Sequence, residues 1–205
     1  MAGGINARIS TDDSNAAGSK RSPLRVASSG KASYRAVFDD IALANNKYVA
    51  LLFNTNTTYD VVIQRVRVVH ANLTSATGVI AEFELRRVSA FTTGTAVTPL
   101  ADDPETDTLP SGVSADHNSS SVTDVSGGLL DRFHRTGEEL VLAADNILLH
   151  GALFNGSIVY ERQDGMRGLT LSGTTAANRG VAVKCVTSTT EGTVNIIVDF
   201  TIEET

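Results

Sequence analysis

The densest group of carboxylates in the chain is the hexapeptide DDPETD, residues 102–107. Oxygen-rich loops bind Ca²⁺, but a calcium-binding loop spaces its acidic ligands at alternate positions before a glycine, and this segment lacks that spacing. Pro104 also fixes part of the backbone that would have to wrap around an ion. We therefore interpret the segment as an acidic loop that faces solvent or a partner. Its candidate partner-binding residues are Asp102, Asp103, Glu105 and Asp107.

The other groups with catalytic potential are scattered along the chain. None of the four histidines has a second histidine at metal-ligand spacing. The adjacent pairs Asp39–Asp40 and Glu138–Glu139 would point to opposite sides of a strand, so neither forms an acid–base pair. Phosphate-binding glycine motifs and the G-x-S-x-G elbow of hydrolases are absent. We expect a protein that is not an enzyme and that binds no cofactor and no metal.

The single cysteine, Cys185, has no partner for an internal disulfide bond. Its neighbours Val183 and Val186 indicate a small buried apolar residue rather than a reactive thiol. The sequence contains no apolar run long enough for a signal peptide or a membrane span. We therefore expect a soluble protein that is made in a reducing cytoplasm.

Charge divides the chain into two parts. Residues 1–36 hold six basic and two acidic residues, a net charge of +4, whereas residues 37–205 hold eleven basic and twenty-one acidic residues, a net charge of −10. Residues 1–33 are also too poor in large apolar side chains to form a core. This composition predicts an extended N-terminal arm; a merely disordered tail is the alternative. The arm's candidate partner-binding residues are Arg8, Lys20, Arg21, Arg25 and Lys31.

The elements that would position these residues are strands. Residues 79–87 and 193–204 alternate between apolar and polar side chains, which is typical of half-buried strands. The core residues that this alternation predicts are Phe83, Leu85, Val194, Ile196, Val198 and Phe200. Residues 60–70 predict a further strand, with Val62, Val66 and Val68 on one face and Arg65 and Arg67 on the other. We further expect hairpin connections at 71–78 and 187–192, and two strands joined by a turn at 139–151. With eight to ten strands and no confident helix, residues 34–205 predict a single all-β domain, an antiparallel β-sandwich of jelly-roll type.

One long segment of the sequence shows no regular spacing of apolar residues. The segment from Val88 to Asp131, both included, holds seven acidic residues, three of the four prolines and no lysine or arginine. Loops of this length in a compact domain usually serve a function or become ordered on a partner. The segment therefore predicts a long acidic loop over about residues 92–127 that has no core of its own.

Three segments, RVASSGKASYRAVFDD, TTGTAVTPLADDPETDTLPSGVSAD and FHRTGEELVLAADNILLHG, together resemble accessory proteins of tailed-bacteriophage virions. The resemblance covers about a third of the chain. It implies a cement or decoration subunit on the capsid surface, often a homo-trimer, that binds the major capsid protein and neighbouring copies of itself.

Other functions remain open at this point. The main alternative is a tail, collar or baseplate subunit that contacts a host receptor. A carbohydrate-binding module or glycan-active enzyme is more distant. Nucleic-acid binding by the arm is a weaker expectation, because its cations are spread out, lack interleaved aromatic residues and are attached to an acidic body.

Overall fold

The computed structural model describes residues 31–73, 78–92, 94–103, 107–137, 157–163, 168–188 and 192–205. Strands make up most of these residues, and Ala176–Asn178 forms a 3₁₀ turn. The strands are β1 (Ser33–Ala42), β2 (Lys47–Asn54), β3 (Tyr59–Leu73), β4 (Gly78–Thr92), β5 (Thr95–Val97), β6 (Leu100–Ala101), β7 (Val113–His117), β8 (Ser121–Gly137), β9 (Ser157–Glu161), β10 (Leu169–Ser172), β11 (Gly180–Ser188) and β12 (Gly192–Glu204). The predicted all-β class is confirmed.

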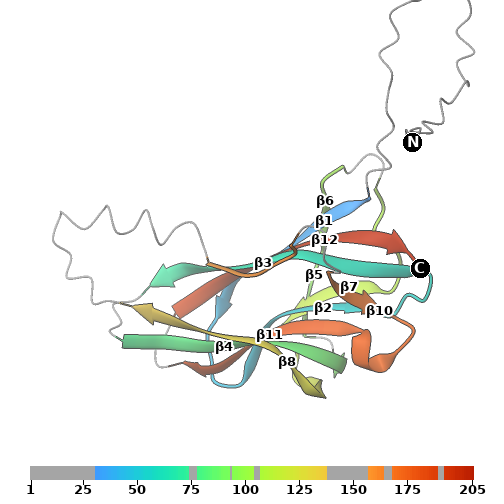
Figure 1. The fold of residues 1–205 in the computed structure, drawn as a ribbon. Coiled ribbons are helices and arrows are strands. Elements are labelled where there is room, and N and C mark those ends of the chain that lie inside the picture. Colours follow the sequence, from blue (N-terminus) through green and yellow to red (C-terminus); the bar gives the residue numbers. More distant parts are fainter. Residues whose placement is uncertain are drawn as a thin grey trace, which may run out of the picture. The chain divides into compact units, whose positions relative to one another are not determined.

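The strands form two antiparallel sheets. Sheet A has the order β10-β3-β12-β1-β6, with β9 also paired to β3, and sheet B has the order β5-β7-β2-β11-β4-β8. Figure 1 shows β3 and β12 in one layer and β11, β4 and β8 in the other. A single cluster of buried apolar side chains draws members from both sheets, so the main core lies between them.

The alternation of apolar and polar side chains in β4 and β12 correctly predicted which residues lie in the core. All six predicted residues are buried, with exposed fractions of 4% or less. Phe200 stacks on Tyr34 of β1, and Phe83 stacks on Phe133 of β8, with ring centroids 5.5 and 5.3 Å apart. Burying side chains of this size contributes about 1.5–3 kcal/mol each, so these positions hold the two layers together.

The connections differ from the predicted hairpins. Strands β3 and β4 follow one another in the chain, but β3 belongs to sheet A and β4 to sheet B. The same holds for β11 and β12. The expected hairpins at 71–78 and 187–192 are therefore wrong, because both connections carry the chain from one sheet to the other. A turn signal marks the end of a strand but does not identify the strand's partner.

The structure also differs from the predicted long loop over 92–127. Its described part contains β5, β6, β7 and the first residues of β8. Strand β7 pairs with β2 and β5, and its Val113 and Ala115 belong to the main core. The sequence analysis did not predict β7, because its inward-facing side chains are small and the residues next to them in the sequence are short and polar. This segment therefore packs on its own domain.

Two further predictions fall wholly or largely outside the described residues. These are the extended arm, of which only residues 31–33 are described, and the strand pair at 139–151. From Lys31 onward the chain forms one compact unit. Lys31 and Ala32 already contact β12: the Lys31 Nζ atom lies 2.5 Å from Glu203 Oε1, and the Ile202 N–H donates to the Ala32 carbonyl over 3.0 Å.

Candidate functional site

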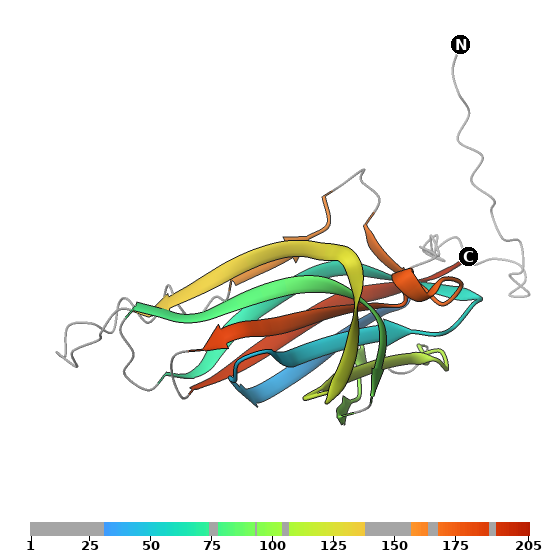
Figure 2. The ribbon, with the colours of Figure 1, turned by 90° about the horizontal axis from the view of Figure 1, so that it is seen from below.

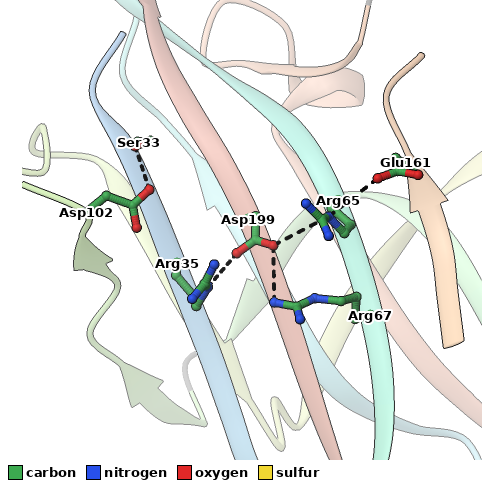
Figure 3. A network of polar contacts seen from close by, with 7 residues as sticks. All are labelled: Ser33, Arg35, Arg65, Arg67, Asp102, Glu161 and Asp199. Atoms are coloured by element: carbon green, nitrogen blue, oxygen red, sulfur yellow. Dashed lines mark hydrogen bonds and ion pairs between the residues drawn. The ribbon is translucent and has the colours of Figure 1, made fainter. Parts of the chain in front are cut away.

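A cluster of charged side chains lies at the centre of the outer face of sheet A, and Asp199 of β12 connects it (Figure 3). The Asp199 carboxylate accepts a hydrogen bond from Arg35 Nε of β1 at 2.6 Å and one from Arg67 Nη2 of β3 at 3.3 Å. Arg65 Nε lies 3.9 Å from Asp199 and 3.6 Å from Glu161 of β9. We call these five residues the Asp199 cluster.

The Asp199 cluster carries more positive than negative charge. Three guanidinium groups face two carboxylates, and the hydrogen bond from Arg35 to Asp199 raises the pKa of that guanidinium above its ordinary value. The Asp199 side chain is only 16% exposed, whereas Arg35 and Arg65 are 49% and 43% exposed. The arginines therefore offer solvent-facing N–H groups that their shared carboxylate holds in place.

Exposed apolar side chains accompany this cluster on sheet A. Val37 of β1 is 38% exposed and pairs with Ile197, and Ile158 of β9 is 50% exposed and pairs with Arg67. Leu100 of the edge strand β6 is 65% exposed. Arginines fixed beside apolar side chains are the composition that protein–protein interfaces favour.

The described members of the predicted partner-binding set are Lys31, Asp102, Asp103 and Asp107. Lys31 precedes β1 and forms an ion pair with Glu203. Asp102 follows β6 and accepts a 2.6 Å hydrogen bond from Ser33 Oγ at the start of β1 (Figure 3). The Asp107 N–H donates to the Asp103 carbonyl over 3.0 Å. Asp102 and Lys31 therefore fasten the residue after β6 and the beginning of β1 to each other and to β12. Arg8, Lys20, Arg21, Arg25 and Glu105 lie outside the described residues.

A second charged group occupies the outer face of sheet B. Glu84 of β4 is almost completely buried there and forms ion pairs with Arg86 of the same strand, at 3.0 Å, and with Arg132 of β8. Arg86 also contacts Asp124 at 3.1 Å, and Tyr48 donates a 2.8 Å hydrogen bond to the same carboxylate. Burial, together with this bond, raises the pKa of the Tyr48 hydroxyl.

The outer face of sheet B also has a small apolar cluster of its own. Leu51, Phe53, Val88 and Ala182 are buried there, and Tyr48, Phe91 and Val122 pack against them. Strand β8 bends sharply near its first residues (Figure 2), where its register against β4 jumps between Arg86–Leu129 and Val88–Asp124. This bulge brings Val122 and Asp124 over the face of the sheet.

Sequence reasoning missed both charged groups, although it had a signal for the first. Arg65 and Arg67 occupy alternate positions of one predicted strand, and Asp199 is an outward acidic residue of another. Opposite charges that lie across neighbouring strands stabilise a sheet. To predict that these charges meet, one must know that β3 pairs with β12, and the alternation of side chains within each strand does not reveal its partner.

Two open hollows lie on the described surface. One of about 400 Å³ has Phe53, Phe91 and Arg179 among its lining residues. The other, of about 510 Å³, has Tyr34, Tyr59, Asp107 and Glu204 among its lining residues. Within the described part of the chain, no group of three or more histidine, cysteine or acidic side chains is arranged to hold a metal ion. The same residues include no helix with the length and apolarity of a membrane span.

No protein-family model, no curated protein and no solved structure matches this chain.

Proposed function

We propose that this protein is a structural subunit of a bacteriophage particle that binds the capsid exterior and stabilises the capsid lattice. The strand order carries the proposal. With the short strands β5, β6, β7 and β9 set aside, β1-β12-β3-β10 faces β2-β11-β4-β8, and the chain changes sheet at every connection except that from β4 to β8. This order supports a jelly-roll type of sandwich, an architecture found in viral capsid proteins, lectins and cupins.

The fold alone does not show which of those functions this protein has. The surface of sheet A gives further support to the capsid function. The Asp199 cluster and its apolar neighbours Val37, Ile158 and Leu100 form a rigid, mixed face on sheet A. Such a face suits repeated contacts with the major capsid protein or with neighbouring copies in a trimer. Modest contacts of this kind become strong attachment when a lattice repeats them.

The alternative assignment is a tail, collar or baseplate subunit, and the number of copies per particle separates the two. We expect quantitative mass spectrometry of purified particles to find hundreds of copies of the protein. About a dozen copies or fewer would place it in the tail and overturn the capsid assignment. Particles that lack the protein should release their DNA at a lower temperature; equal robustness combined with failed adsorption to cells would favour host-receptor contact.

Attachment through sheet A has its own test. Arg35→Glu reverses one solvent-facing charge of the Asp199 cluster and should weaken binding of the purified protein to particles that lack it. The loss should grow smaller as salt is added, because exposed charges are screened over about 8–10 Å at ordinary ionic strength. Lys47→Glu, in strand β2 of sheet B, is the matched control and should bind normally, because among the described residues the Lys47 ammonium contacts only a backbone carbonyl, at an exposed position. Equal losses in the two variants would exclude sheet A as the specific attachment face.

A further inference from the structure

The hollow of about 400 Å³ on the outer face of sheet B has the composition of a ligand site. It lies between the ends of β2, β4 and β7, and its apolar floor includes Phe53 and Phe91. Three hydroxyl side chains line it, from Thr55, Ser89 and Ser114. Among the described residues that line it, Arg179 is the only charged one. An apolar floor with a few convergent polar groups is the usual composition of a small-molecule site.

The floor is an aromatic platform that depends on Gly180. Phe53 pairs with Gly180 across β2 and β11, and Gly180 pairs with Val88 across β11 and β4. A Cβ atom at Gly180 would lie 2.5 Å from both the Phe53 ring and Val88. The missing side chain therefore lets Phe53 lie across β11, where its ring meets Phe91 edge to face with centroids 5.1 Å apart.

The single cation is held in place by the backbone. Arg179 follows the 3₁₀ turn, and its Nε atom donates a 3.3 Å hydrogen bond to the Gly173 carbonyl. Gly173 is itself tied to the end of β2, because its N–H donates to the Asn56 carbonyl over 3.1 Å. This bond uses Nε and leaves the fork of terminal nitrogens for a ligand. A guanidinium fork matches a carboxylate in a bidentate geometry.

The hydroxyl groups extend the polar rim on the other sides. Thr55 Oγ1 donates to the Gly112 carbonyl at 3.2 Å, and Ser89 Oγ donates to the Thr123 carbonyl at 3.2 Å. A hydroxyl that donates in this way keeps its lone pairs for accepting hydrogen bonds. Both oxygens can therefore accept from the hydroxyl groups of a polyol.

We propose that this hollow binds an acidic saccharide residue, with the carboxylate on Arg179 and an apolar face of the sugar ring on Phe91, which the buried Phe53 ring supports. A neutral sugar would leave the guanidinium without a counter-charge, and a simple anion would leave the aromatic platform uncovered. The site goes beyond the proposed lattice contact, because it lies on sheet B and the Asp199 cluster lies on sheet A. A particle subunit with such a site would also attach to acidic glycans.

Two matched sugar pairs test the proposal with the full-length protein: 3′-sialyllactose against lactose, and glucuronate against glucose. Saturation-transfer NMR and amide chemical-shift titration measure binding. We expect both acidic sugars to bind about tenfold or more tightly than their neutral partners, the margin that a charge-assisted bidentate contact supports. The shifted amides should include those of Gly112 and Gly173.

Variants separate the two parts of the site. Arg179→Gln should lower the affinity for the acidic sugars to that of the neutral ones, and Phe91→Ala should lower the affinity for both. Arg65→Gln, on the opposite sheet, is the matched control and should bind like the unmodified protein. Thermal unfolding checks that each variant is folded, and Phe91→Leu replaces Phe91→Ala where it is not.

Three results would overturn the site: no binding of any of the four sugars, equal binding of acidic and neutral sugars, or shifts confined to the hollow at Tyr34 and Tyr59. None of these results bears on the copy number in particles, so the saccharide site and the proposed lattice function fail independently.

Discussion

At the scale of single residues, two buried polar side chains, Asp116 and Asn54, hold neighbouring strands and turns in place. Asp116 is 1% exposed, and its Oδ1 atom accepts hydrogen bonds from the Gly94 N–H at 2.9 Å and from Ser119 Oγ at 2.8 Å. Asn54 is fully buried and donates to the carbonyls of Tyr59 and Leu171, which lie on β3 and β10. Asp116 thus fixes the turns around β7, and Asn54 ties the end of β2 to the other sheet.

Asp199→Asn should destabilise the protein by about 1–3 kcal/mol, because three arginines would lose the charge of the carboxylate that holds them. Chemical denaturation at low salt measures the change, and the difference should narrow when salt is added. Asp39→Asn, an exposed acidic residue of the neighbouring strand β1, is the control and should change stability little. A loss for Asp199→Asn no larger than that of the control would show that the cluster contributes nothing to folding.

Phe200→Ala should lower the free energy of unfolding by about 3–5 kcal/mol, the cost of truncating a large aromatic side chain in a packed core. Phe200 is 1% exposed and stacks on Tyr34, so the lost ring leaves a cavity between β12 and β1. Denaturant unfolding followed by circular dichroism gives the value. A loss below 1 kcal/mol would mean that the two layers can close over the missing ring.

The Cys185 thiol should react very slowly with alkylating reagents in the folded protein. It is fully buried, and this burial raises its pKa to about 11, so almost no thiolate forms at neutral pH. The unfolded thiol ionises at lower pH, so this group should destabilise the folded state as the pH rises from about 9 towards 11. Iodoacetamide labelling with and without denaturant measures the protection, and fast labelling without denaturant would contradict it.

At the scale of strands, alternation predicted which face is buried wherever the pleat is regular. In β12, Val194 to Ile202 face the core at every second position, as expected. In β3 the expectation placed Val62 with Val66 and Val68, but the core cluster contains Val61 and Ile63 instead. The pairing with β12 jumps between Arg65–Asp199 and Ile63–Phe200, so a bulge at Gln64 shifts the phase of the pleat.

Strand partners were harder to predict than strands, for a physical reason. A strand's alternation records the polarity of its two faces, whereas its edges bond through backbone groups that every residue carries. The pairing of β1 with β12 therefore left no trace in either segment alone. The aromatic hollow on sheet B was missed for the same reason, because its lining comes from separate strands and from the residue after the 3₁₀ turn.

Strand β7 should resist hydrogen exchange in the isolated protein. It pairs with β2 on one side and β5 on the other, and Val113 and Ala115 anchor it in the main core. Amides of residues 113–117 should exchange as slowly as those of β2, because opening them requires breaking the sheet. Mass-spectrometric exchange on the monomeric protein tests this. Fast exchange of these amides in the isolated protein, with protection only in particles, would favour the original prediction of a loop that a partner orders.

At the scale of the whole molecule, all described core residues belong to the unit from Lys31 onward. Removing Met1–Gly30 should therefore leave the midpoint of thermal unfolding within a few degrees of that of the full chain, while weakening attachment to particles. The cut must stop there, because Lys31 and Ala32 contact β12. A control that also removes residues 31–33 should be less stable. A truncated protein that coats particles normally would exclude residues 1–30 as an anchor.

The position of β12 in sheet A also constrains how the protein can be synthesised. Strand β12 follows all the other described strands in sequence, yet it lies between β1 and β3, which do not pair with each other. While the chain emerges from the ribosome, β1 and β3 must wait with their inner edges unpaired until residues 192–204 have left the exit tunnel. Exposed edges invite pairing with other chains. Nascent copies on one messenger would therefore be most prone to misassociate just before residues 192–204 emerge, and slowing translation of the codons for these residues should lower the soluble yield.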